Sequence, residues 1–68
     1  MDIIKPGTIL NNGATVLQQR IKPNGENYVL ALYEGEFVTW FLTRSGVALS
    51  GDYHDQNLPQ AIQSLANR

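Results

Sequence analysis

His54 is the residue best suited to acid–base chemistry in this sequence, and it is the only histidine among the 68 residues. It lies in the segment Asp52-Tyr53-His54-Asp55, where a neighbouring carboxylate could orient the imidazole as a general base. The same segment is also typical of a polar turn between a strand and a helix, in which Asp55 and Asn57 bind backbone amides. We expect the turn, and therefore no catalytic residue at this position.

Other catalytic and ligand-binding motifs are absent from the sequence. With no cysteine and one histidine, the chain cannot supply the ligands of a zinc site, and its carboxylates do not follow the spacing of a calcium loop. The sequence contains no nucleophile motif, phosphate-binding loop or dinucleotide fingerprint. We therefore expect a protein that is not an enzyme and that binds no metal, cofactor or small-molecule substrate.

The charged residues are nearly balanced, five Lys and Arg against six Asp and Glu, for a net charge of −1. Nucleic-acid-binding domains usually carry a basic surplus, because neutralising phosphates supplies most of their affinity. The turns described next would bring three basic residues to one end of a sheet, namely Arg20, Lys22 and Arg44. They would bring four acidic residues to the opposite end, namely Glu34, Glu36, Asp52 and Asp55. These charges either keep the hairpin ends soluble or dock a partner of complementary charge.

Turn signals at short intervals predict an antiparallel meander of four to five strands. The turns are expected at residues 11–13, 23–25, 34–36 and 44–46, where Gly, Asn and Pro gather. Aromatic and β-branched residues from Tyr28 to Tyr33 and from Phe37 to Leu42 predict the two central strands. A brief run at 8–10, a longer one at 14–22 and a weaker one at 47–53 predict the outer strands, the last with a bulge at Gly51.

The last segment has the period of a helix, with one apolar stripe formed by Leu58, Ala61, Ile62 and Leu65. Asn57 is a good N-cap, and Pro59 falls in the first turn, where its missing N–H costs nothing. A helix of about three turns is not stable alone, so it must pack on one face of the sheet. The predicted fold is therefore α+β, and the length allows a single domain, residues 1–68.

Both faces of the predicted central hairpin are apolar, although an antiparallel sheet usually keeps one polar face. One face carries Tyr28, Leu30, Leu32, Phe37, Thr39 and Phe41. The other carries Val29, Ala31, Tyr33, Val38, Trp40 and Leu42. Either the sheet curls so that the outer strands and the N-terminal arm cover this second face, or the face binds a partner protein or a second copy. The aromatic rings are expected to pack in the core rather than to stack on bases.

Four segments together resemble a type of small bacterial and phage protein that has no assigned function. They are Asn12-Gly13-Ala14-Thr15-Val16-Leu17, Tyr28-Val29-Leu30-Ala31, Phe37-Val38-Thr39-Trp40, and Gly51-Asp52-Tyr53 followed by a short helix. The likeness covers most of the chain and brings no catalytic or binding residues with it. It implies an accessory protein of phage or mobile-element origin that acts by binding and blocking another macromolecule.

The longest apolar stretch, Val29 to Tyr33, is too short to cross a membrane, and residues 1–6 lack the features of a secretory signal. We therefore expect a cytoplasmic, non-catalytic protein-interaction domain. Its predicted partner-binding residues are Tyr33, Val38, Trp40 and Leu42 on the second apolar face, with Arg20, Lys22 and Arg44 at the basic end. The alternative is a nucleic-acid-binding protein that uses the same basic end.

Overall fold

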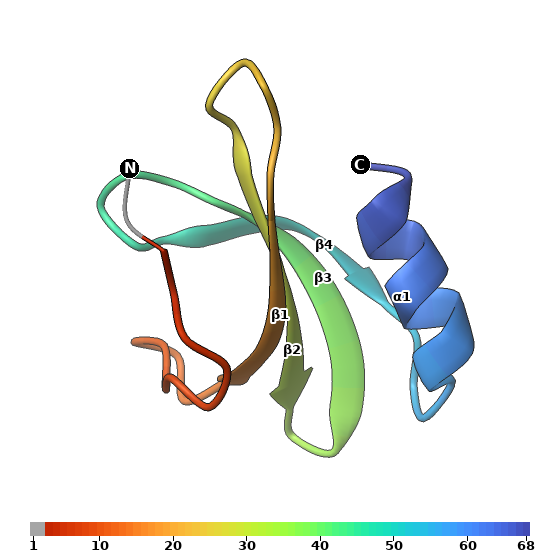
Figure 1. Cartoon of the computed structure of the whole chain (residues 1–68). Coiled ribbons are helices and arrows are strands. Elements are labelled where there is room, and N and C mark those ends of the chain that lie inside the picture. The colour runs from red at the N-terminus through yellow and green to blue at the C-terminus, as the bar shows by residue number, and fades with distance from the viewer. Residues whose placement is uncertain (1–2) are drawn as a thin grey trace.

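The computed structural model describes residues 3–68, so Met1 and Asp2 of the predicted single domain lie outside the described residues. Four strands, β1 (Thr15–Ile21), β2 (Asn27–Tyr33), β3 (Glu36–Leu42) and β4 (Ala48–Tyr53), are followed by one helix, α1 (Leu58–Ala66). The strands form one antiparallel sheet in the order β1-β2-β3-β4 (Figure 1). The predicted α+β meander with a C-terminal helix is therefore confirmed.

The predicted first hairpin forms a turn but no strand before it. Gly13 adopts φ 89, the backbone N–H of Ala14 donates to Asn12 Oδ1, and the N–H of Leu10 donates to the carbonyl of Ala14. The run at 8–10 then contributes a single bridge, Ile9 to Thr15, instead of a strand. Residues 3–10 thus form an N-terminal arm that folds back against the sheet on the side opposite α1 (Figure 1).

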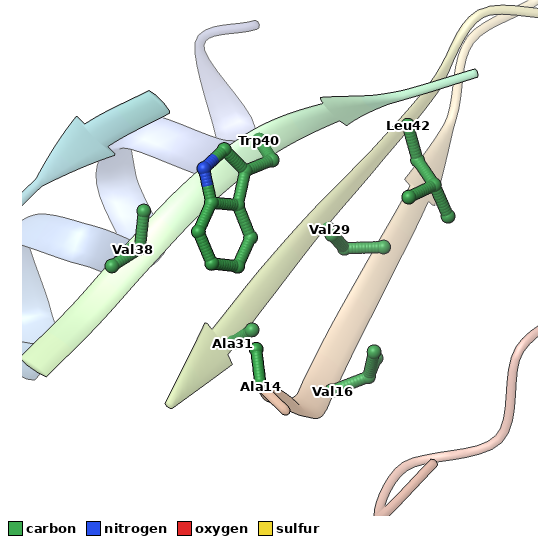
Figure 2. Packing of buried hydrophobic residues seen from close by; sticks show 7 residues of the cluster. All are labelled: Ala14, Val16, Val29, Ala31, Val38, Trp40 and Leu42. Atoms are coloured by element: carbon green, nitrogen blue, oxygen red, sulfur yellow. The ribbon is translucent and has the colours of Figure 1, made fainter. Parts of the chain in front are cut away.

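This arm covers the apolar face that includes Trp40. The buried cluster there comprises Ala14, Val16, Val29, Ala31, Val38, Trp40 and Leu42, whose side chains gather on one side of the strands (Figure 2). Ile4 and Leu10 of the arm pack against it, as do the half-buried Tyr33 and Ala48. The N–H of Ile4 also donates to Gln19 Oε1, which ties the arm to β1.

The interpretation of this face as a partner surface is therefore corrected at three positions. Val38, Trp40 and Leu42 are buried within the one chain, and Trp40 is only 5% exposed. The physical reason is that the N-terminal arm covers this face, as the alternative interpretation of the sequence allows. Ile4 and Leu10 of the arm pack on the cluster and exclude solvent from it. Of the four apolar residues assigned to that surface, only Tyr33 keeps part of its side chain exposed.

The helix α1 covers the other face. Its buried residues Ala61 and Leu65 pack on Leu30, with the half-buried Tyr28 and Phe37 beside them. Asn57 caps the helix as predicted, since its Oδ1 accepts from the N–H of Gln60 at 3.2 Å. This short helix therefore depends on the sheet for most of its stability.

The side chain of Arg68 joins the C-terminal end of the helix to the sheet through several hydrogen bonds. Its guanidinium donates to Thr39 Oγ1 at 3.2 Å, to the Thr39 carbonyl at 3.1 Å and to the carbonyl of Ser50. It also pairs with Asp52 at 3.2 Å and lies 5.4 Å from the ring centre of Tyr28. With 13% of its side chain exposed, Arg68 joins α1, β2, β3 and β4 in one contact network.

A bulge in β4 lets the sheet fold around Trp40. The register between β3 and β4 shifts opposite Trp40, and Ser50 adopts φ 55. The indole lies directly over Gly51, so that a Cβ added there would be 2.7 Å from Trp40 Nε1 and 3.0 Å from a Tyr53 ring atom. The predicted bulge at Gly51 is therefore confirmed, and the close approach of the indole explains the glycine.

We expect Gly51→Ala to destabilise the fold by about 1–3 kcal/mol, because the new methyl group must displace a packed indole ring. Urea unfolding followed by tryptophan fluorescence measures the change. Ser50→Gly is the matched control in the same bulge: it removes the cost of a positive φ and should leave stability unchanged or slightly higher. Equal destabilisation by both substitutions would contradict the steric explanation.

We also expect Arg68→Gln to cost about 2 kcal/mol, because charged hydrogen bonds to Thr39, Ser50 and Asp52 are lost together. Hydrogen exchange should show α1 amides losing more protection than the amides of β2. Arg20→Gln is the control, since Arg20 is exposed and its removal should change stability by less than about 0.5 kcal/mol.

Candidate interaction surface

The outer edge of β4 is the most open part of the sheet among residues 3–68. β4 is a terminal strand, and five of its six residues are exposed. Leu49 is 47% exposed and Tyr53 57%, which is high for large apolar and aromatic side chains in a strand. We call residues 47–55 on this side the β4 edge.

The β4 edge presents these side chains on both sides of the sheet. Leu49 lies opposite Phe41, so it points to the side covered by α1. Tyr53 lies opposite Val38 and packs edge-on against Trp40, with ring centres 6.4 Å apart, so it points to the side covered by the arm. A partner that pairs with this edge would therefore meet apolar surface above and below the strand.

The other terminal strand is less open. The N–H of Val16 donates to the carbonyl of Thr8, and the carbonyl of Val16 accepts from the N–H of Gly7. A register shift between Val16 and Gln18 also interrupts β1 just beyond this point. Both terminal strands contain an irregularity, but in residues 3–68 only β1 has part of its outer edge hydrogen-bonded to another backbone segment, so β4 is the better docking edge.

An acidic cluster lies at the end of the β4 edge. Asp55 accepts a backbone hydrogen bond from Phe37, the neighbour of Glu36 in β3, and Glu34 precedes them in the β2–β3 turn. The pKa of the Glu36 carboxyl is raised, chiefly by the hydrogen bond that its protonated form makes with Asp55. Partial desolvation and the negative charges of Asp55 and Glu34 act in the same direction.

Asp52 does not belong to this cluster, which corrects the predicted acidic end. Its carboxylate pairs with Arg68 and accepts from Ser64 Oγ at 3.4 Å, on the side of the sheet that α1 covers. Glu34, Glu36 and Asp55 form no ion pair in the described part of the chain, where Arg68–Asp52 is the only salt bridge.

The three predicted basic residues lie at one end of the sheet, two of them near the β1–β2 turn and the third in the β3–β4 turn. Arg20 lies opposite Tyr28 and is exposed, and the ammonium of Lys22 lies 5.8 Å from the same ring's centre. Arg44 is exposed in the β3–β4 turn, where it lines a groove together with Asn24 and Glu26 of the β1–β2 turn. The two turns are thus neighbours at one end of the sheet, but Arg44 alone lies next to the β4 edge.

His54 shows no catalytic arrangement. Its Nε2 is buried and has no hydrogen-bond partner. Neither flanking carboxylate orients the ring among the described residues, since Asp52 pairs with Arg68 and Asp55 neighbours Glu36. In residues 3–68, no three His, Asp or Glu side chains are grouped so that they could hold a metal ion.

The helical stripe predicted from the sequence is only half buried. Ala61 and Leu65 face the sheet, but Leu58 is 37% exposed and Ile62 44%. Ser64 contacts Thr39 on β3, and at 100° per residue this orientation turns Ile62 to the flank of the helix. The stripe therefore overestimates how much of so short a helix the sheet can cover.

No protein-family model, no curated protein and no solved structure matches the chain. The likeness to small bacterial and phage proteins therefore stays a prediction. Across the described residues, no helix has the length and apolar character needed to cross a membrane.

We expect Glu36→Gln to raise the thermal midpoint at neutral pH, because it removes repulsion from Asp55 and Glu34. A carboxyl whose pKa is raised on folding stabilises the fold below its unfolded pKa, and that contribution is lost as pH rises through the raised value. The gain from the substitution should therefore disappear in acid. Glu26→Gln, at the other end of the sheet, is the control, and an equal gain there would contradict the cluster effect.

Proposed function

We propose that this protein is a small, non-catalytic protein-interaction module whose docking surface is the β4 edge. The observation that carries the proposal is the exposure of Leu49 and Tyr53 on a strand that has no outer neighbour within residues 3–68. The apolar face assigned to a partner from the sequence is taken up by the protein's own core, so the docking surface moves to this edge.

Strand addition is the recognition mode that such an edge supports. A partner strand gains main-chain hydrogen bonds along the edge, and side chains above and below the strand give specificity. The bulge at Ser50 and Gly51 keeps the regular stretch short, which favours one register over open-ended pairing. A module of this kind acts by occupying a partner's surface, in keeping with the accessory or inhibitory role implied by the resemblance.

A photo-crosslinking residue at position 49 tests the proposal in cell lysate. We expect a discrete adduct to a protein from position 49, and none from the same residue placed at Gln18, which is exposed on β1. Adducts between two copies of the chain count as binding as well. Absence of any adduct from position 49, or the same adducts from both positions, would contradict the proposal.

A nucleic-acid-binding role remains the second candidate because of one observation. Arg20 and Lys22 lie beside Tyr28, whose ring packs against Phe41 with centres 5.5 Å apart, so two cations and two rings share one face of the sheet. Rings with nearby cations are the usual platform for single-stranded nucleic acid. The net charge of −1 and the contact of Arg68 with the same ring make this the weaker candidate.

Fluorescence anisotropy with a single-stranded oligonucleotide tests this candidate. If it holds, binding appears at low salt, weakens as salt is added, and is lost in the double variant Arg20→Gln with Lys22→Gln. Arg44→Gln is the matched control away from Tyr28 and should bind like the unmodified protein. No binding at low salt would eliminate the role.

A further inference from the structure

We propose that the occupant of the β4 edge is a second copy of this chain, paired antiparallel about a two-fold axis near Ser50 and Gly51. This inference rests on the proposed function, because it names the partner of the same edge. It follows from the opposite charges at the two ends of the strand, none of which forms an ion pair within the described part of the chain.

The β4 edge begins and ends with opposite charge. The turn that leads into it carries the exposed Arg44, and Asp55, with Glu36 and Glu34 beside it, lies just past its last strand residue. Antiparallel pairing of two identical edges places the start of one against the end of the other. Each Arg44 then meets the acidic cluster of the other copy, and symmetry forms this contact twice.

The spacing along the strand allows this arrangement. At a rise of about 3.3 Å per residue, Asp55 lies about 17 Å beyond Ser50 and Val47 lies about 10 Å before it. The turn and the long side chain of Arg44 extend beyond Val47 and make up the difference. An axis near Ser50 therefore brings opposite charges together, whereas parallel pairing would place each Arg44 beside the other.

The apolar side chains of the edge also suit a two-fold pair. An axis perpendicular to the sheet keeps the α1 side of both copies on the same side. The two Leu49 side chains then lie close to the axis on that side, and Tyr53 of each copy lies towards Ala48 of the other on the arm side. Both of these exposed side chains would become partly covered.

Such a pair would close without growing further. The two-fold pair uses the same β4 edge of both copies and leaves no β4 edge free, and the β1 edge is partly occupied by the N-terminal arm at Val16. Pairing through β4 therefore gives a dimer and not a fibre. The contact is small and depends on exposed charges, so we expect a dimer that dissociates on dilution and on adding salt.

Sedimentation equilibrium over a range of protein and salt concentrations tests this dimer. At low salt we expect a monomer–dimer equilibrium, and Arg44→Glu should weaken it roughly tenfold or more because attraction becomes repulsion at both contacts. Combining Arg44→Glu with Glu36→Lys should restore the dimer, since the two charges are exchanged. Arg20→Glu makes the same charge reversal on β1 and should leave dimerisation unchanged.

Circular dichroism of each variant establishes that it is folded, so that loss of dimer is not loss of structure. A monomer under all conditions, a dimer indifferent to Arg44→Glu, or a double variant that stays monomeric would overturn the inference. Crosslinking from position 49 separates this failure from failure of the proposed function. If the chain is monomeric and position 49 crosslinks to a different protein, only the dimer is contradicted. If position 49 gives no adduct at all, both the dimer and the proposed function are contradicted.

Discussion

A sheet that is apolar on both faces must be covered twice, and this constraint governs the rest of the molecule. Helix α1 supplies one cover through Ala61 and Leu65, and the arm at residues 3–10 supplies the other through Ile4 and Leu10. Neither cover has a core of its own, so each depends on the sheet as much as the sheet depends on it. In so small a domain, few other apolar residues remain to replace either one.

Polar contacts hold both covers at their edges. Arg68 binds backbone and side-chain oxygens of β3 and β4, and Gln19 joins the arm to β2 by accepting from Ile4 and donating to Asn27. The Thr39 hydroxyl, which is fully buried, is one of the groups that they satisfy, together with the Ser64 hydroxyl. With both faces covered, the β4 edge is the part of the sheet that stays most exposed.

Local sequence signals were sufficient for the meander, the helix with its Asn57 cap, and the bulge at Gly51, because turns, caps and strand alternation depend on near neighbours. Local signals do not decide whether the N-terminal arm or a partner covers the Trp40 face, since residues 3–10 show no regular spacing of apolar residues. Asp52 was assigned to the wrong cluster, because its partner Arg68 is 16 residues away and no sequence pattern joins them. Residues 47–53 are predicted as an outer strand, but the exposure of Leu49 and Tyr53 depends on how far the helix and the arm reach over the sheet, which local signals do not predict.

The meander has a consequence for how the protein reaches its native state. Every strand pairs with its sequence neighbour, so the hairpins close short loops and can form early at low entropic cost. The two covers pack on the sheet, so a partly folded chain that lacks either cover exposes an apolar face. Such a species is prone to aggregate, and the speed with which arm and helix arrive decides how long the chain remains at risk.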